Sequence, residues 1–359
     1  MKSSPNPAFI FTTRVLDLPG FDTSTVLAVR AFPGESLEYL AVDNRGTVWR
    51  ISAHDSVATA IVKLDTLRFH ARTQVQIQIS RCGDYFAITA CNQDPASNQG
   101  GVYRMDNGAL LMPLPDHEYH FELAPYPVAF WEYQHQPCLI HATGWDKLDI
   151  HNLQSGVCLT ERSLEQVEEE VSEAERRNAL ASEWAGELMI SPDGKRLATV
   201  GWFWHPVGYA WGFNIQDWVE KNKWESDFGK SKVCFAIWSY FWDSPLQWLD
   251  NDRVLIWGDP ELPCDNDIPP DSAVIYNAQT GERLFAFTGP SISPFAVWDN
   301  WLFSGCSDTG TIAVWDLQNG QQIARHPCQL NLIATHLPSQ SFLGRNAQGQ
   351  FEIMFWQVA

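Results

Sequence analysis

The chain lacks any long apolar run. Its longest, VCFAIWSYFW at 233–242, spans ten residues, whereas a membrane-spanning helix needs roughly twenty. The opening MKSSPNPAFIF carries one lysine and the short apolar run AFIF, which is too brief for the core of a signal peptide. We therefore expect no membrane association and no export, and place the protein in the cytoplasm.

Basic residues are also scarce. The chain has 24 Lys and Arg against 43 Asp and Glu, for a net charge of −19. A field of this sign repels phosphate backbones and anionic lipid surfaces, so we expect no nucleic-acid partner. It favours a basic protein partner. The alternative is that the charge only keeps the protein soluble.

No motif of a known catalytic or cofactor site occurs. The chain has no GxSxG, HExxH or GxGxxG. The Gly-Lys pair in SPDGKR (191–196) lacks the rest of a phosphate loop, and Pro-Asp-Gly favours a β-turn there. The eight cysteines form no CxxC pair, so we expect them to be reduced and mostly buried. These absences predict no cofactor and a protein that is not an enzyme.

Two patterns resemble metal sites only in part. His117 and His120 stand three apart without a third ligand nearby. Asp265 and Asp267 are spaced like part of a calcium loop, but Pro270 occupies the position where glycine is needed. We interpret the second pattern as a solvated acidic loop and predict no metal site.

A repeat runs along the whole chain. VWDLQNG (314–320) matches YNAQTG (276–281), HNLQSG (151–156) and YRMDNG (103–108), each with glycine four residues after the polar position. Looser copies of the aromatic–polar–apolar triplet begin at Trp49, Phe213 and Trp356. The seven copies lie 39 to 63 residues apart, and each follows strand-like sequence with turn signals. Four short strands per unit at this spacing are typical of propeller blades.

The residues around Trp315 support a family resemblance. Val314-Trp315-Asp316 resembles the strand ending of a WD40 repeat, and ISPDGKRLAT (190–199) is similar to the first hairpin of WD40-like blades. Only one Trp-Asp occurs at the repeat position, and the usual Gly-His is missing. The resemblance covers nearly the whole chain and implies an all-β, seven-bladed β-propeller with a single domain over residues 1–359.

The last repeat has sequence for only three strands. FIFTTRVLDL at the beginning of the chain has no unit of its own. Because an unpaired sheet edge is a liability, we expect this N-terminal strand to form the outer strand of the last blade and close the ring.

Long steps in the repeat mark insertions. After the third copy, Ser163 and Gln166 form a capping box, and apolar residues at helical spacing predict an amphipathic helix at about 163–185, between blades 3 and 4. In WD40-like propellers this connection shares the top rim with the loops 91–101, 204–208 and 258–272. A second insertion, 216–232, is expected on the opposite rim.

The stretch GWFWHPVGYAWGFN (201–214) contains six aromatic residues. Phe213 occupies the aromatic position of the repeat, and strand alternation puts Trp211 and Tyr209 on its face. Most of the stretch is therefore expected to be packing. Only the hairpin tip, with Trp204, His205 and Tyr209, is expected to reach a partner.

These observations predict a monomeric, non-catalytic protein-interaction scaffold, in one version an acidic inhibitor or immunity-type binder of a basic protein. The residues predicted to contact the partner are Glu165, Glu168, Glu169, Glu173, Trp204, His205, Tyr209, Asp265 and Asp267. The alternative is a binder of small, glycan-like ligands, or an enzyme, that uses the central funnel.

Overall fold

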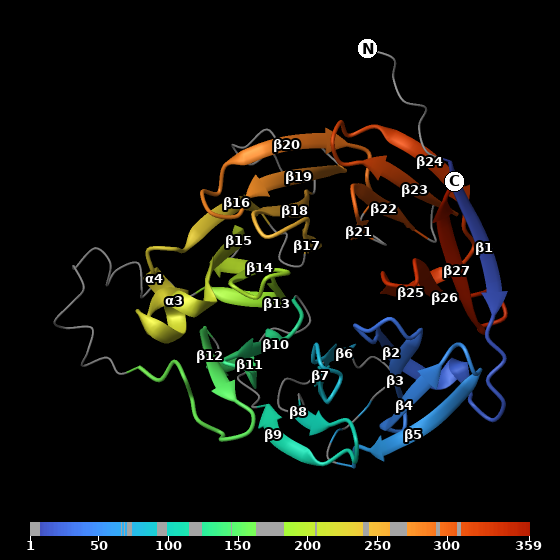
Figure 1. The fold of residues 1–359 in the computed structure, drawn as a ribbon, viewed down its shortest axis with the longest axis horizontal. Coiled ribbons are helices and arrows are strands. Elements are labelled where there is room, and N and C mark those ends of the chain that lie inside the picture. The colour runs from blue at the N-terminus through green and yellow to red at the C-terminus, as the bar shows by residue number, and fades with distance from the viewer. Residues whose placement is uncertain are drawn as a thin grey trace. The chain divides into compact units, whose positions relative to one another are not determined.

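Each repeat found in the sequence folds into an antiparallel β-sheet, and the chain is an all-β, seven-bladed β-propeller, as predicted (Figure 1). The computed structural model describes residues 8–65, 67, 69, 74–91, 99–114, 124–144, 146–162, 183–204, 207–239, 244–258, 271–291, 295–306 and 310–359. The chain divides into two compact units, residues 1–114 with 290–359 and residues 115–289.

The first unit contains four sheets of four strands. Their strands are β2 (Val26–Ala31), β3 (Glu38–Asp43), β4 (Thr47–Ser52) and β5 (Val57–Lys63); β6 (Gln74–Ile79), β7 (Tyr85–Cys91), β8 (Gln99–Arg104) and β9 (Leu110–Leu114); β21 (Phe295–Trp298), β22 (Trp301–Cys306), β23 (Thr311–Asp316) and β24 (Gln322–Pro327); and β25 (Asn331–His336), β26 (Ser341–Arg345) and β27 (Phe351–Val358) with β1 (Phe9–Val15). A 3₁₀ turn, η1 (Thr23–Thr25), precedes β2.

The second unit contains three sheets. Their strands are β10 (Val128–Tyr133), β11 (Gln136–Gly144) and β12 (Lys147–Asn152); β13 (Trp184–Ile190), β14 (Arg196–Trp204), β15 (Val207–Asn214) and β16 (Val233–Ser239); and β17 (Leu246–Trp248), β18 (Arg253–Gly258), β19 (Ser272–Asn277) and β20 (Arg283–Thr288). Two short helices, α3 (Ile215–Glu220) and α4 (Glu225–Phe228), lie between β15 and β16.

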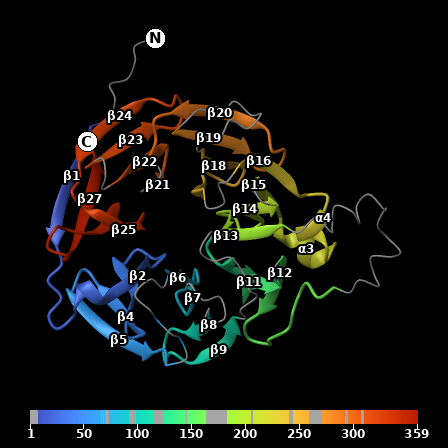
Figure 2. The ribbon, with the colours of Figure 1, turned by 180° about the vertical axis from the view of Figure 1, so that it is seen from behind.

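The N-terminal strand completes the last blade. β1 pairs antiparallel with β27, from Phe9 opposite Val358 to Val15 opposite Glu352, and both views place the two strands side by side (Figure 2). Phe9 and Phe11 then reach the neighbouring sheet: the Phe9 ring contacts Trp301 at 5.7 Å and Phe11 stacks on His326 at 4.5 Å between ring centroids. The predicted outer strand is confirmed.

The seven aromatic or histidine positions of the repeat all lie in the third strand of their blades. They are Trp49, Tyr103, His151, Phe213, Tyr276, Trp315 and Trp356. The four tightest copies end in the same turn, in which the glycine N–H donates to the carbonyl four residues earlier, as Gly281 does to Asn277 at 2.9 Å. These glycines have φ between 68° and 73°, where L-residues are disfavoured. The glycine recurs in the repeat because this turn requires a positive φ at that position.

Apolar side chains fill the layers between neighbouring sheets. In the first unit, Phe303 of β22 meets Phe342 of β26 and Trp356 of β27 with ring centroids 5.6 and 4.6 Å away, and all three are buried. In the second unit, Trp131 and Ile140 of one sheet share a cluster with residues of β13 to β15. The sheet β13–β16 packs on both sides, because its strands contribute to two separate clusters, and so does the sheet that contains β26 and β27.

The second insertion, 216–232, leaves β15 at the end away from the β14–β15 hairpin, as predicted. Asn214 caps α3 by accepting a hydrogen bond from the Asp217 N–H at 2.9 Å. Trp218 of α3 is fully buried, with its ring 5.3 Å from Phe213. The insertion is therefore packed onto its blade.

The predicted helix at 163–185 lies almost wholly outside the described residues, because the structure describes only 183–185 of that range. Among the described residues, no helix has the length and apolar character required to cross a membrane. The six described cysteines with free thiols depart from the expectation that most are buried: only Cys138 and Cys328 are buried, whereas Cys82 and Cys234 are exposed. Cysteines of outer turns and strands have one face to solvent, which the sequence pattern did not reveal.

Two matched glycine substitutions test the repeated turn. Gly156→Ala and Gly281→Ala both place a side chain at φ of about +70°, which costs about 1–2 kcal/mol. Nothing lies within 4 Å of a Cβ at position 156, but a Cβ at position 281 would stand 2.3 Å from the Cys234 carbonyl oxygen. We expect Gly281→Ala to lower the free energy of unfolding by about 1–3 kcal/mol more than Gly156→Ala, as measured by chemical denaturation. Equal losses would contradict this account of the turn.

Candidate protein-binding site

The edge of the sheet β10–β12 is where the chain leaves toward the acidic segment 163–182. Beyond the turn at Gly156, Cys158 forms an isolated bridge with His151, and the Leu159 N–H donates to the Ile150 carbonyl at 2.7 Å. Residues 157–160 therefore follow β12 in the place where the six other sheets have a fourth strand. Only a few backbone groups of residues 157–160 pair with β12, so these residues do not form a regular fourth strand.

Asp149 of β12 is the centre of a buried polar cluster. The residue is 2% exposed, and its carboxylate accepts hydrogen bonds from Thr160 Oγ1 at 2.9 Å, from Arg162 at 2.7 Å and from Thr143. Lys147 Nζ lies 3.2 Å away. A buried carboxylate is tolerated only when it is paired and hydrogen-bonded, and here each oxygen has such partners.

Arg162 joins this cluster to the insertion. Its side chain is 2% exposed, and its second terminal nitrogen lies 3.1 Å from the Asp227 carboxylate of α4. The guanidinium also stands 5.1 Å from the ring centroid of Trp224. Arg162 therefore holds two carboxylates from different elements and stacks on an aromatic ring, uses for which its planar fork is suited. It fixes the chain immediately before residue 163.

The other flank of the acidic segment is tied to the same insertion. Lys232 forms an ion pair with Glu183, donates to the Asp227 carbonyl at 2.8 Å and lies 5.8 Å over the Trp211 ring. Asp227 thus contacts Arg162 through its side chain and Lys232 through its main chain. The set Asp149, Arg162, Asp227, Lys232 and Glu183, named the anchor network from here on, holds both flanks of residues 163–182.

Burial dominates the titration of two carboxyl groups in the anchor network. The pKa of Asp227 is raised by burial, an effect that the nearby Arg162 and Lys232 oppose but do not cancel. The pKa of Glu183 is raised for the same reason, with Lys232 opposing. Burial therefore disfavours the ionised form of both carboxyl groups, and the neighbouring Arg162 and Lys232 partly offset this effect.

The aromatic stretch at 201–214 is mostly packing, as predicted. Trp202 stacks on Trp184 with centroids 5.4 Å apart, and Tyr209 stacks on Trp211 at 4.8 Å. Trp211 and Phe213 are 2% and 0% exposed. Little of the aromatic surface that the structure describes in this stretch remains as a platform for a glycan, so the alternative of a small-ligand binder is not favoured.

Of the residues predicted to contact a partner, the structure describes the side chain of Tyr209 alone. Tyr209 is half-buried, and its pKa is raised by burial and by the nearby Glu183 carboxylate. The predicted contact residue thus lies beside the anchor network. Trp204 ends β14 opposite Val207, with its side chain outside the described part, where Glu165, Glu168, Glu169, Glu173, His205, Asp265 and Asp267 also lie.

Sequence reasoning missed the anchor network. A charged residue inside the strand LDIHN, and a single arginine directly before a run of glutamates, were the available signals. It also gave no sign that residues of the insertion 216–232 bind both flanks of the acidic segment.

Within the described residues, no group of three or more histidine, cysteine, aspartate or glutamate side chains could hold a metal ion. His141 and His151 do meet, with Nε2 of the first 3.0 Å from Nδ1 of the second. Nδ1 of His141 lies 2.8 Å from the Ala142 carbonyl, so the pair is a hydrogen-bonded core contact. His117 and His120 lie outside the described residues.

Comparison with protein-family models gives no match, and comparison with curated proteins gives none either.

Removing the arginine of the anchor network tests its role. Arg162→Gln leaves the Asp227 carboxylate without its ion pair and weakens that of Asp149, and breaking a buried pair from one side costs about 3–5 kcal/mol. We expect a loss of this size in the free energy of unfolding, with faster alkylation of Cys158, whose thiol pKa burial raises. Denaturation and peptide-resolved mass spectrometry measure the two effects. A loss below about 1 kcal/mol would show that the network is not an anchor.

Removing an acidic residue of the anchor network should change the pH dependence of the free energy of unfolding. Asp227→Asn deletes a carboxylate whose raised pKa means that the folded chain binds its proton more tightly than the unfolded chain. The stability that wild type gains from this proton is present at low pH and is lost as the pH rises through the raised pKa. We therefore expect wild type to lose stability relative to Asp227→Asn as the pH rises from about 4. Denaturation at a series of pH values measures the difference, and a difference that grows in favour of wild type would refute the sign.

Proposed function

We propose that the protein is a non-catalytic interaction scaffold that binds a basic protein through its acidic segment, residues 163–182. The observation that carries the proposal is the anchor network, which ties both flanks of this segment to the insertion 216–232. The segment contains six glutamates and two arginines. A chain attached at both ends has fewer conformations to lose on binding, so the attachment favours a binding role over simple solubility.

The overall charge supports the same partner. With −19 on the chain, a basic protein is drawn in from solution, and charge complementarity raises the association rate more than the final affinity. The loop 258–272 adds five carboxylates and no basic residue. In its specific form the proposal is an acidic inhibitor or immunity-type protein that covers a basic toxin or enzyme.

The remaining features of the proposal follow from the repeat and the cysteines. We regard the chain as a degenerate WD40-like propeller, on the strength of Val314-Trp315-Asp316 and the shared turn. Free thiols, two of them exposed, suit a reducing compartment, so we propose that it acts in the cytoplasm, as a monomer.

Capture of the partner tests the proposal. Immobilised wild type is incubated with lysate of its native host, and the bound protein is identified and purified. We expect a basic protein whose association rate falls steeply as salt rises. Replacing Glu165, Glu168, Glu169 and Glu173 with glutamine should lower the association rate about tenfold, as measured by biolayer interferometry.

A matched control separates local from overall charge. Glu35→Gln with Asp65→Asn, Asp84→Asn and Asp299→Asn removes four exposed carboxylates of the other unit and changes the net charge by the same amount. This control should keep at least about half of the wild-type rate. An equal fall in both variants, a partner that is not basic, or binding that is indifferent to salt would overturn the proposal.

A further inference from the structure

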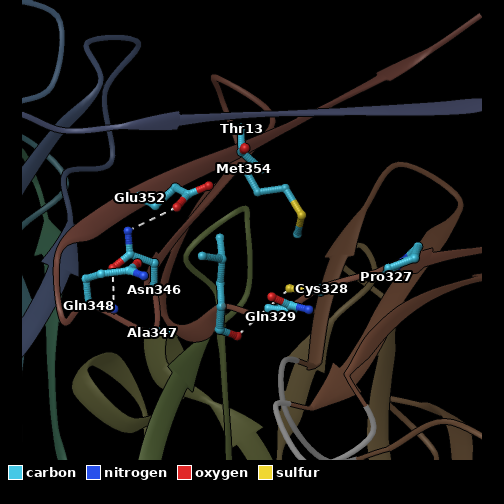
Figure 3. A pocket seen from close by; sticks show the side chains of 10 residues that line it. Thr13, Pro327, Cys328, Gln329, Asn346, Ala347, Gln348, Glu352 and Met354 are labelled. Atoms are coloured by element: carbon cyan, nitrogen blue, oxygen red, sulfur yellow. Dashed lines mark hydrogen bonds between the residues drawn. The ribbon is translucent and has the colours of Figure 1, made fainter.

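A small cavity opens in the first unit. It lies between residues 327–330, at the end of β24 and in its connection to β25, and the turn from β26 to β27. Thr13 of β1 borders it. Its volume is about 230 Å³. Figure 3 shows Met354 pointing from β27 toward the connection that carries Cys328 and Gln329.

The base of the cavity is apolar. Cys328, Leu330 and Met354 line it and are 6%, 6% and 1% exposed, and all three belong to the apolar layer between the sheets of β22 and β27. Burial raises the pKa of the Cys328 thiol, so the thiol stays neutral and adds no charge. The cavity is therefore the place where this inter-sheet core opens to solvent.

The walls are polar and carry one carboxylate. Asn346 accepts from the backbone N–H groups of Gln348 at 3.1 Å and Gln350 at 3.0 Å, and its amide donates to Glu352 at 3.3 Å (Figure 3). Glu352 and Met354 lie two residues apart along β27, so their side chains are on the same face of the strand, and both line the cavity. Among the described residues, no lysine, arginine or histidine forms an ion pair with Glu352.

Size and chemistry together limit the occupant. Pockets for small-molecule ligands measure about 300–1,000 Å³, so a cavity of about 230 Å³ suits one side chain. An apolar base below a carboxylate matches a long basic side chain, which packs its methylene stem on apolar surface and keeps its charge at the polar end. The side-chain amides of Gln329 and Gln348 add acceptors. Acceptors on both sides of the cavity favour the five donors of arginine over the compact ammonium of lysine.

We propose that this cavity binds the side chain of one arginine from the protein partner, with the stem on Met354 and Leu330 and the guanidinium on Glu352. The partner rests on the proposed function, but the preference of the cavity for a guanidinium group does not. Arginine is among the residues that most often dominate binding energy at protein interfaces. The acidic segment would then attract the partner, and the cavity would fix its orientation.

Methionine methyl groups report on the cavity directly. The chain has five methionines, so a ¹³C-methyl-methionine NMR spectrum is simple, and Met354→Leu identifies the signal of Met354. We titrate the full chain with Nα-acetyl-arginine methylamide and, separately, with the corresponding citrulline and lysine compounds. Citrulline keeps the shape of arginine and lacks its charge.

We expect the Met354 methyl signal to shift saturably with the arginine compound, with about tenfold weaker binding of the citrulline and lysine compounds. Glu352→Gln should weaken arginine binding about tenfold without changing the thermal midpoint, because Glu352 has a single long hydrogen bond to lose. Glu35→Gln, on an exposed residue outside the cavity, is the control and should leave arginine binding unchanged.

Three results would overturn the assignment: no shift of the Met354 signal, equal binding of citrulline, or equal binding of lysine. Failure of the proposed function appears separately, because it is read from host capture and not from this titration. If no basic partner is captured and the Met354 signal still responds to the arginine compound alone, the guanidinium site is supported and the proposed basic protein partner is rejected.

Discussion

The pairing of Arg162 with Asp149 and Asp227 is the constraint on which the candidate binding site depends. The three side chains come from the edge of one sheet, the exit of the chain and a helix of a separate insertion. All lie in a region where an unpaired charge would be expensive. Because each charge needs the others, the exit point of residues 163–182 is fixed by electrostatics, and the Lys232–Glu183 pair fixes the return.

The propeller explains why the two proposed binding sites lie at edges and turns. Neighbouring sheets pack face to face, so large aromatic residues such as Trp211, Phe213 and Trp356 are buried between them. What remains for recognition is the chain between strands. The anchor network lies on one such connection, and the cavity beside Glu352 lies between two others. A rigid scaffold that presents variable connections suits a binding protein.

The two sites differ in what they supply. In the proposed function the acidic segment provides charge, which acts over about 10 Å at ordinary salt concentrations and would accelerate encounter. The cavity would provide shape, since its apolar base and carboxylate would distinguish arginine from a neutral side chain of equal size. Attraction followed by selection at a separate point would let an acidic surface bind one basic protein in preference to others.

Local rules made the fold readable from the sequence. The turn of the four tightest repeats needs glycine at a positive φ, and the polar residue four positions earlier supplies the carbonyl that the glycine N–H binds. In three of the four copies this residue is Asn or Asp, whose side chain also accepts a hydrogen bond from the turn, so the motif is visible in the sequence. The need to pair an edge strand likewise predicted β1 beside β27. The sequence by itself therefore determined the blades, their number and the fate of the N-terminal strand. Only the tertiary structure decided that Arg162 meets Asp227, 65 positions away, and that Glu352 faces the connection 327–330. Contacts between distant segments depend on how insertions fold back on the sheets, and no spacing in the sequence encodes that.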